Sequence, residues 1–304
     1  MKKIVVFYYS QTGQAQQIAQ NVCKPLAEAG YQVVYKCIEP VTPFPFPWSY
    51  WNFFQAFPET RLLMPAPIKE FDLSDVQDAD LVFLAGQSWY LSPSQPIEAF
   101  LTSPQVRTYL KNRPVVTING CRNMWAMAQK EVRKQLVSME AQYVGHIVLQ
   151  DYAPNLISVV TIFRWLFRQQ KAATRIWPAA GVSDADMAGA SRFGKLIQSA
   201  LEQNDLEQLQ SALVAAGSVP YKPSLVFVEK TGHRIFGFWA KFIRKAGDRN
   251  SPDRRFRLRL FVYYLFFVLY VVSPFGLLFF YLTYPLRMAG IRKEKADLLL
   301  NLKE

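Results

Sequence analysis

One segment decides the fold of this chain: Lys3-Ile4-Val5-Val6-Phe7-Tyr8-Tyr9-Ser10-Gln11-Thr12-Gly13-Gln14-Ala15. An apolar, β-branched strand ends at a short turn, and the pattern from Gln16 to Ala29 predicts a helix directly after it. Such a turn aims backbone N–H groups and the positive end of the helix dipole at one point, which suits a phosphate. Ser10 and Thr12 add hydroxyl donors, and Gly13 lacks the Cβ that would keep an anion away.

A single glycine fits neither the dinucleotide fingerprint nor the nucleoside-triphosphate loop. The turn instead resembles the phosphate loop of flavodoxin-like proteins, Ser/Thr-x-Thr-Gly-x, here Ser10-Gln11-Thr12-Gly13-Gln14. The resemblance implies flavin mononucleotide (FMN) as cofactor, with its phosphate held by Ser10, Gln11, Thr12, Gly13, Gln14 and Ala15. The alternative is an ordinary strand–helix turn that binds no ligand.

Four further strands are predicted from short apolar runs: Tyr31–Ile38, Ala79–Ala85, Arg113–Ile118 and Tyr143–Leu149. Helical segments alternate with them, and a last helix is expected from Asp184 to Leu201. This order predicts an α/β fold, a flavodoxin-like doubly wound five-stranded parallel sheet, in residues 1–205. Ligands of such sheets lie at the carboxyl ends of the strands, where the strand order reverses.

Two more loops follow predicted strand ends. In flavodoxin-like proteins the corresponding loops contact the flavin ring, and the resemblance carries that role to Gln87, Ser88, Trp89, Tyr90, Asn119, Gly120, Cys121 and Arg122. Trp89 or Tyr90 is expected to stack on the ring or to lie at its edge. Arg122 is placed to stabilise negative charge on a reduced flavin or a substrate enolate. The alternative for Arg122 is a surface ion pair.

Two segments depart from a minimal fold of this kind. Residues 40–68 contain seven prolines, and eight aromatic residues lie between Phe44 and Phe57, so a lid or a cap over the sheet is expected instead of a regular helix. An apolar insertion, 151–178, contains a predicted helix from Leu156 to Phe167 whose few polar residues form a narrow stripe. Such a helix is either buried in protein or lies in lipid.

The C-terminal part, from Tyr221 onward, is both hydrophobic and basic. Leu260–Leu286 holds 27 uncharged residues, more than the roughly 20 that a membrane-spanning helix needs. From Tyr221 onward, 16 Lys and Arg stand against 6 Asp and Glu, so most of the net charge of +12 lies here. Beside an apolar run this charge indicates an anionic membrane surface and not nucleic acid. Residues 206–253 are interpreted as a basic interfacial connector and 254–304 as the membrane-associated region.

The break Ser273-Pro274-Phe275-Gly276 and the basic residues on both flanks favour a helical hairpin that dips into the cytoplasmic leaflet. A kinked single span is the alternative. Three widely spaced cysteines indicate reduced thiols, and the chain starts without a signal-peptide pattern, so the expected location is the cytoplasmic face of the bacterial inner membrane. No metal-ligand spacing is present, so the chemistry is expected to belong to the flavin.

A closer resemblance rests on Tyr8–Gln14, Pro43–Trp48, Ala56–Glu59, Gly120–Trp125 and the hydrophobic, basic tail. These motifs resemble the bacterial family of dialkylresorcinol condensing enzymes, which serves flexirubin, aryl-polyene and dialkylresorcinol biosynthesis. The resemblance implies that a ketosynthase-like partner joins the carbon chains. This protein would then oxidise the resulting dialkyl-cyclohexanedione to the resorcinol, with Tyr90 or a water as base and Arg122 or Asn123 at the enolate oxygen.

Two other functions fit the same residues. One is a membrane-tethered electron carrier or NAD(P)H:quinone reductase that has no carbon substrate of its own. The other is a flavin-free scaffold that holds the ketosynthase-like partner at the membrane. A homodimer is compatible with each of these functions.

Overall fold

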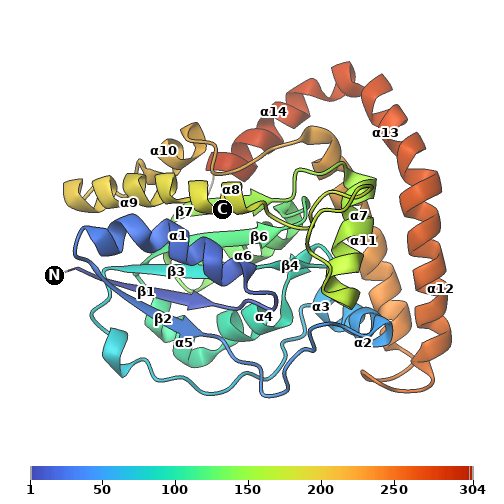
Figure 1. The fold of residues 1–304 in the computed structure, drawn as a ribbon, viewed down its shortest axis with the longest axis horizontal. Helices are drawn as coiled ribbons and strands as arrows, with labels where there is room; N and C mark the ends of the chain where they lie inside the picture. The colour runs from blue at the N-terminus through green and yellow to red at the C-terminus, as the bar shows by residue number, and fades with distance from the viewer. Residues whose placement is uncertain (1, 301, 303–304) are drawn as a thin grey trace.

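The computed structural model describes residues 2–300 and 302, and its centre is a five-stranded sheet (Figure 1). The strand order is β2-β1-β3-β6-β7, and every neighbouring pair is parallel. The strands are β1 (Lys3–Tyr8), β2 (Gln32–Cys37), β3 (Leu81–Gly86), β6 (Pro114–Cys121) and β7 (Gln142–Gln150). The five predicted strands are therefore confirmed, with boundaries that differ by up to three residues.

Helices cover both faces of the sheet, as continuous apolar strands require. One face is covered by α1 (Gln14–Glu28), α8 (Asp184–Gly189), α9 (Ser191–Gln203) and α10 (Leu209–Ala215). The other is covered by α4 (Gln95–Thr102), α5 (Pro104–Leu110) and α6 (Ala126–Ser138). The single closing helix expected from Asp184 to Leu201 is divided at Ala190, where hydrogen bonds run from residue i to i−3.

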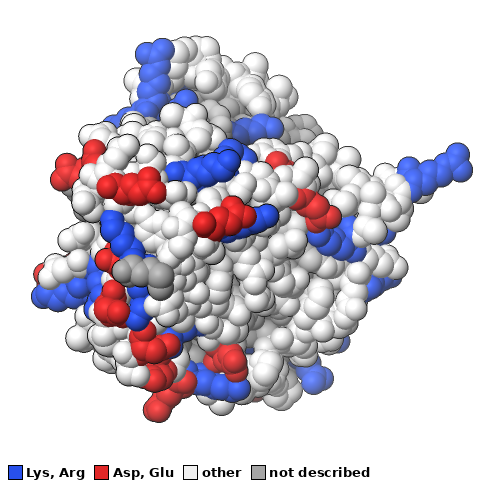
Figure 2. All heavy atoms as spheres, turned by 60° about the vertical axis from the view of Figure 1, so that its left-hand side comes forward, with Lys and Arg blue, Asp and Glu red and all other residues white. Residues whose placement is uncertain are grey.

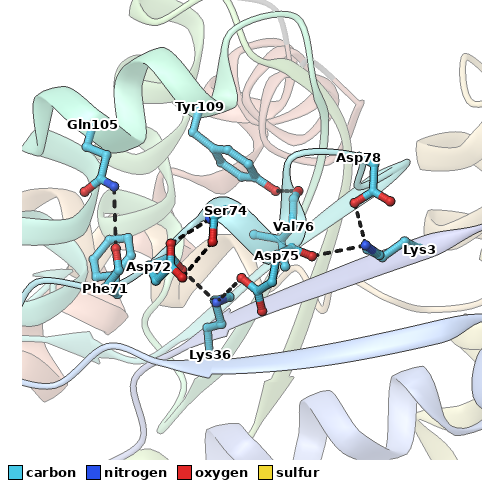
Figure 3. Close-up of polar contacts among 10 residues, drawn as sticks. All are labelled: Lys3, Lys36, Phe71, Asp72, Ser74, Asp75, Val76, Asp78, Gln105 and Tyr109. Carbon is cyan, nitrogen blue, oxygen red and sulfur yellow. Dashed lines mark hydrogen bonds and ion pairs between the residues drawn. The ribbon is translucent and has the colours of Figure 1, made fainter.

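The loop before β3 is fastened to the first two strands by two lysines (Figure 3). It contains the short 3₁₀ helix η1 (Ser74–Val76). The Lys36 ammonium lies 2.6 Å from an Asp75 carboxylate oxygen, and Lys3 pairs with Asp78. The Tyr109 hydroxyl donates to the Val76 carbonyl oxygen at 2.7 Å. The carboxylates are largely exposed, so each pair contributes about 0–1 kcal/mol to stability.

The proline-rich segment 40–68 is irregular where the prolines cluster and helical afterwards. Two short helices follow, α2 (Tyr50–Gln55) and α3 (Phe57–Arg61). Phe44 and Trp48 are buried, and both rings contact Trp89 at the carboxyl end of the sheet. The segment thus covers the carboxyl ends of the strands. Both interpretations of the sequence, a lid and a cap, predict this position.

Two added helices and a long C-terminal helix pack beside this end of the sheet (Figure 1). The added helices are α7 (Asn155–Arg168) and α11 (Pro223–Arg244). The long helix runs from Arg254 to Leu282 and comprises α12 (Arg254–Phe267), the π-helical turn η2 (Val268–Val272) and α13 (Ser273–Leu282). The chain then turns at Thr283 into α14 (Tyr284–Leu300), which returns to the sheet domain.

The helical hairpin expected around Ser273-Pro274-Phe275-Gly276 is not formed, because the helix continues through these residues. Proline normally interrupts a helix because it lacks an N–H and its ring clashes with the carbonyl four residues earlier. Here the preceding turn widens, and the Ser273 N–H donates to the Val268 carbonyl five residues back. This π turn accommodates Pro274 without ending the helix.

The long helix is joined to α3 by a buried ion pair and a ring stack. Arg254 is fully buried, and its guanidinium donates to both Glu59 carboxylate oxygens, at 2.7 and 3.1 Å. Phe57 stacks on Phe261 with ring centroids 3.9 Å apart. These two contacts fix the start of the long helix against α3.

Replacing Arg254 with alanine is expected to lower the free energy of unfolding by about 3–5 kcal/mol, because it leaves the Glu59 carboxylate buried without its main partner. The measurement is urea unfolding of the full chain in a non-denaturing detergent. Arg255→Ala is the matched control, because Arg255 is exposed on the same helical turn. Equal stability of the two variants would contradict the structural role of the pair.

Candidate functional site

The turn after β1 has the geometry that suits an anion. Gly13 has a left-handed backbone (φ +84°), and a Cβ placed on it would meet nothing within 4 Å. The α1 helix begins at Gln14, so its first N–H groups face this open space. The Gln11 and Gln14 side chains are bound to the backbone of Pro45 and Val182. Ser10, Thr12 and the backbone N–H groups thus remain for a ligand.

The second loop is a tight hairpin between β4 (Ser88–Trp89) and β5 (Ser92–Pro93). Its two central residues, Tyr90 and Leu91, both have positive φ, 48° and 64°. Left-handed backbone costs a non-glycine residue about 1–2 kcal/mol, and such strain gathers at functional sites. The hairpin points the Trp89 ring toward the strand ends, where Tyr9, Phe44 and Trp48 contact it at an angle.

Tyr90 does not have the environment of a base. Its hydroxyl donates to the Phe53 carbonyl oxygen, and burial raises the pKa of Tyr90 well above its usual value. A neutral phenol that already donates its proton to the backbone has a positioning role at neutral pH. The structure thus argues against the expected proton abstraction by Tyr90.

The third loop is bound to the N-terminus of α7. Arg122 Nη1 donates to the Asn155 carbonyl oxygen, to Asn155 Oδ1 and to Ser158 Oγ at 2.8–2.9 Å, and Asn123 Nδ2 donates to Asn155 Oδ1 at 2.8 Å. Burial lowers the pKa of Arg122 to about 10, opposed by the nearby Asp151 carboxylate. The guanidinium therefore stays charged at neutral pH and is a partly buried cation, unlike the surface ion pair that was the alternative.

Each of the three loops contains a buried polar atom that has no hydrogen-bond partner within the described residues. Among them are Ser10 Oγ, Gln87 Nε2, Ser92 Oγ, Asn119 Oδ1 and Asn123 Oδ1. A buried polar atom without a partner costs about 1–3 kcal/mol, and most proteins satisfy nearly all of them. Such atoms on all three loops at one edge of the sheet indicate a site for a polar ligand.

An apolar cavity of about 390 Å³ begins at these loops and extends between the added helices. At the sheet end it is lined by Gln11, Ser88, Trp89, Tyr90, Leu91, Arg122 and Met124. Beyond them, α7, α11 and the Arg254–Leu282 helix supply walls of Val, Ile, Leu and Phe. Its volume lies within the range of small-molecule sites. The structure thus brings residues of all three predicted loops to one cavity.

The cavity wall contains features that sequence reasoning missed. The interpretation of 206–253 as an interfacial connector overlooked α11, which lines the cavity with Phe227, Val228, Thr231, Gly232, Ile235 and Phe236. Glu229 on α11 is buried, and its carboxylate accepts from the Ala126 and Met127 N–H groups at the start of α6. Burial raises the pKa of Glu229 to about 7, opposed by these hydrogen bonds.

Two histidines lie away from the three loops. His146 is fully buried in β7, where it bonds Thr117, which confirms its place in the core. His233 on α11 is half-buried, and the Arg61 guanidinium lies 3.0 Å from its Nδ1. Burial and this cation lower the pKa of His233 to about 4. Within the described residues, no three potential metal ligands of the His, Cys, Asp and Glu types gather.

Solved structures similar to this chain are flavoproteins. A flavoprotein in complex with FMN from Lactobacillus acidophilus NCFM shares 15% sequence identity, covering 49% of this chain and 93% of that protein with a TM-score of 0.38. A flavodoxin from the domain Archaea shares 11% identity, covering 63% and 93% of the two chains (TM-score 0.37). An oxidised flavodoxin from Bacillus cereus shares 13%, covering 64% and 95% (TM-score 0.34). No family model matches the sequence, and no curated protein matches it.

The strand order itself assigns the fold. In chain order the sheet reads 2-1-3-4-5, which is the order of flavodoxin and related doubly wound proteins. The fold is flavodoxin-like. In a flavodoxin-like sheet the order reverses between the first and third strands, and the carboxyl ends of β1 and β3 here carry the Ser10 turn and the Trp89 hairpin. The three-loop site therefore occupies the ligand position of this fold.

Replacing Arg122 with leucine is expected to loosen α7, because it removes three hydrogen bonds that hold Asn155 and Ser158. Hydrogen–deuterium exchange is expected to rise at least tenfold in the first two turns of α7. Arg168→Leu is the control, because Arg168 is exposed at the other end of the same helix. Unchanged exchange in Arg122→Leu would show that the interaction does not hold the helix.

Proposed function

We propose that this protein is an FMN-dependent oxidoreductase that acts on an apolar substrate. The observation that carries the proposal is that all three loops contribute to one apolar cavity, with Gln11 from the first loop, Trp89 from the second and Arg122 from the third. Other residues of the same loops carry buried polar atoms without a partner in the described residues. The loops offer polar contacts to a cofactor, and the cavity beyond them offers an apolar environment to a substrate.

The residues present fit FMN. Ser10 Oγ, Thr12 and the N–H groups at the start of α1 would hold the phosphate, with Gly13 leaving room for it. Trp89 lines the cavity and would supply an aromatic wall, and the unpartnered polar atoms of Gln87, Asn119 and Asn123 would pair with donors and acceptors of the flavin ring. FMN bound there would supply two-electron redox chemistry. These contacts remain predictions.

Arg122 is the charged group of the cavity wall. Among the described residues, Asn155 and Ser158 engage only its Nη1 atom, so the other guanidinium nitrogens remain available toward the cavity. A cation in a low-dielectric site stabilises developing negative charge far more strongly than one in water. Arg122 would therefore hold an enolate-type oxygen of the substrate, with Asn123 beside it.

The apolar part of the cavity favours an oxidoreductase over an electron carrier. A carrier needs an exposed cofactor edge and a docking face of one charge, whereas three helices cover these loops here. Figure 2 shows acidic and basic side chains side by side on the face that it presents. That face is turned away from the three loops, so the preference for an oxidoreductase rests on the helices that cover the loops.

Gly13→Ala is expected to weaken FMN binding at least tenfold, because the added Cβ occupies the space left for the phosphate. The measurement is titration of the flavin-free full chain with FMN, followed by quenching of flavin fluorescence. Gly30→Ala is a closely matched control, since Gly30 ends the same helix with φ +85° and equally open surroundings. Both variants therefore suffer the same backbone strain. Absence of FMN binding by the wild-type chain would refute the proposal.

The narrower substrate is a dialkyl-cyclohexanedione supplied by a ketosynthase-like partner, as the sequence resemblance implies. Its alkyl chains match the apolar walls, and its acidic ring oxygens match Arg122. Incubation of the flavin-loaded chain with such a dione and oxygen is expected to yield the resorcinol, detected by mass as a loss of two hydrogens. Arg122→Leu is expected to reduce that rate more than tenfold. Turnover of quinones with NAD(P)H, but not of diones, would favour the reductase alternative.

A further inference from the structure

The outer face of the Arg254–Leu282 helix is an exposed apolar stripe. Its members recur every three or four residues and point away from the protein: Phe256, Leu260, Tyr263, Phe267, Val271, Phe275, Leu278 and Leu282. Only 6% of the most apolar window of this helix is buried, and the mean hydropathy of that window is 2.2. We refer to these eight residues as the outer stripe. A contiguous apolar surface of this length marks a contact with lipid or protein.

The opposite face of the same helix packs on the domain. Leu258, Phe261 and Val262 are buried against α3 and α11, and Leu265, Val268 and Leu269 line the cavity. A helix that crosses a bilayer on its own would have to give up these contacts. The helix therefore has two apolar faces: one packs on protein, and the other is exposed.

Both ends of the helix are fastened to the same domain. At the start, Arg254 pairs with Glu59 on α3. After the end, α14 returns to the domain, where Asp297 pairs with Lys130 and Arg133 on α6, and Gln210 donates to the Leu299 carbonyl oxygen. A spanning helix would carry its two ends to opposite sides of the membrane. These contacts keep them on one side.

We propose that the Arg254–Leu282 helix lies in the plane of an anionic lipid surface, with the outer stripe among the acyl chains. This inference concerns the protein surface alone and does not depend on the flavin site. Exposed cations occur near both ends of the stripe: Arg255 precedes it, Arg259 lies in its first turn, and Arg292 and Lys293 follow it on α14. Such cations attract anionic headgroups by about 1 kcal/mol each near the surface. Helices of this kind lie in the interface with one face buried.

The cavity and the outer stripe lie on different faces of the same helix. Val272 lines the cavity and is also 42% exposed, and it lies next to Val271 of the stripe. With the helix in the plane of the bilayer, this helix would lie between the cavity and the acyl chains.

The first experiment is flotation of the full chain with vesicles of phosphatidylcholine, with and without phosphatidylglycerol. Binding is expected to be stronger with the anionic lipid and to weaken about tenfold or more in Phe267→Glu, which places a charge in the stripe. Ile176→Glu is the matched control, because Ile176 is equally apolar and 78% exposed but lies outside the stripe. Equal binding of the two variants, or no binding by the wild type, would overturn the proposal.

The second experiment separates an in-plane helix from a spanning one. Cysteines are introduced one at a time as Arg255→Cys and Met288→Cys in a background that carries Cys37→Ser and Cys121→Ser, which leaves the buried Cys23 as the one native thiol. The variants are treated with a membrane-impermeant maleimide on sealed vesicles. Both sites are expected to react from the outside. If one of the two cysteines reacts with the maleimide only after the vesicles are lysed, the helix spans the membrane and the proposal is wrong. A stripe covered by a second copy of the chain would instead give a dimer in solution that does not float.

Discussion

The two added helices, α7 and α11, and the long Arg254–Leu282 helix form a helical layer beside the sheet domain. The position of this layer depends on the buried ion pair between Arg254 and Glu59. Its two residues are 195 positions apart in the chain, and the pair fixes where the long helix starts relative to the sheet domain. Arg244 adds a second cation 3.7 Å from Glu59. A buried pair stabilises weakly compared with an apolar contact, but loss of one partner is costly, so such a pair specifies one arrangement. That arrangement forms the outer wall of the cavity.

The sheet domain and the helical layer contribute different chemistry to one site. The flavodoxin-like domain provides turns with unpartnered polar atoms and a helix N-terminus, features that recur wherever parallel strands end. The helical layer provides a wall of Val, Ile, Leu and Phe. Arg122 of the third loop binds Ser158 of α7 and so holds that helix over the loops. Neither part alone encloses the cavity, so the ligand preference of this chain is set by residues that a minimal fold lacks.

Much of the fold could be predicted from the sequence because its signals are local. Continuous apolar runs gave the five strands, and the Ser10–Ala15 turn located the ligand edge. The burial of Arg254 could not be predicted, since its neighbours Arg255 and Arg259 look alike and only its distant partner distinguishes it. The sequence shows the polar stripe of α7 but not whether that stripe faces solvent or protein. In the structure Ser158 and Thr161 are buried. Ser158 faces inward because it accepts a hydrogen bond from the Arg122 guanidinium.

The π turn Val268–Val272 sets the phase of the long helix. It inserts one residue relative to a regular helix, and each residue advances the side chains by about 100°. Without this insertion the half beyond Pro274 would rotate by that amount, which would move Phe275 off the outer face and Phe280 out of its buried position. The number of residues between Arg254 and Pro274 thus determines which side chains of the second half face the domain.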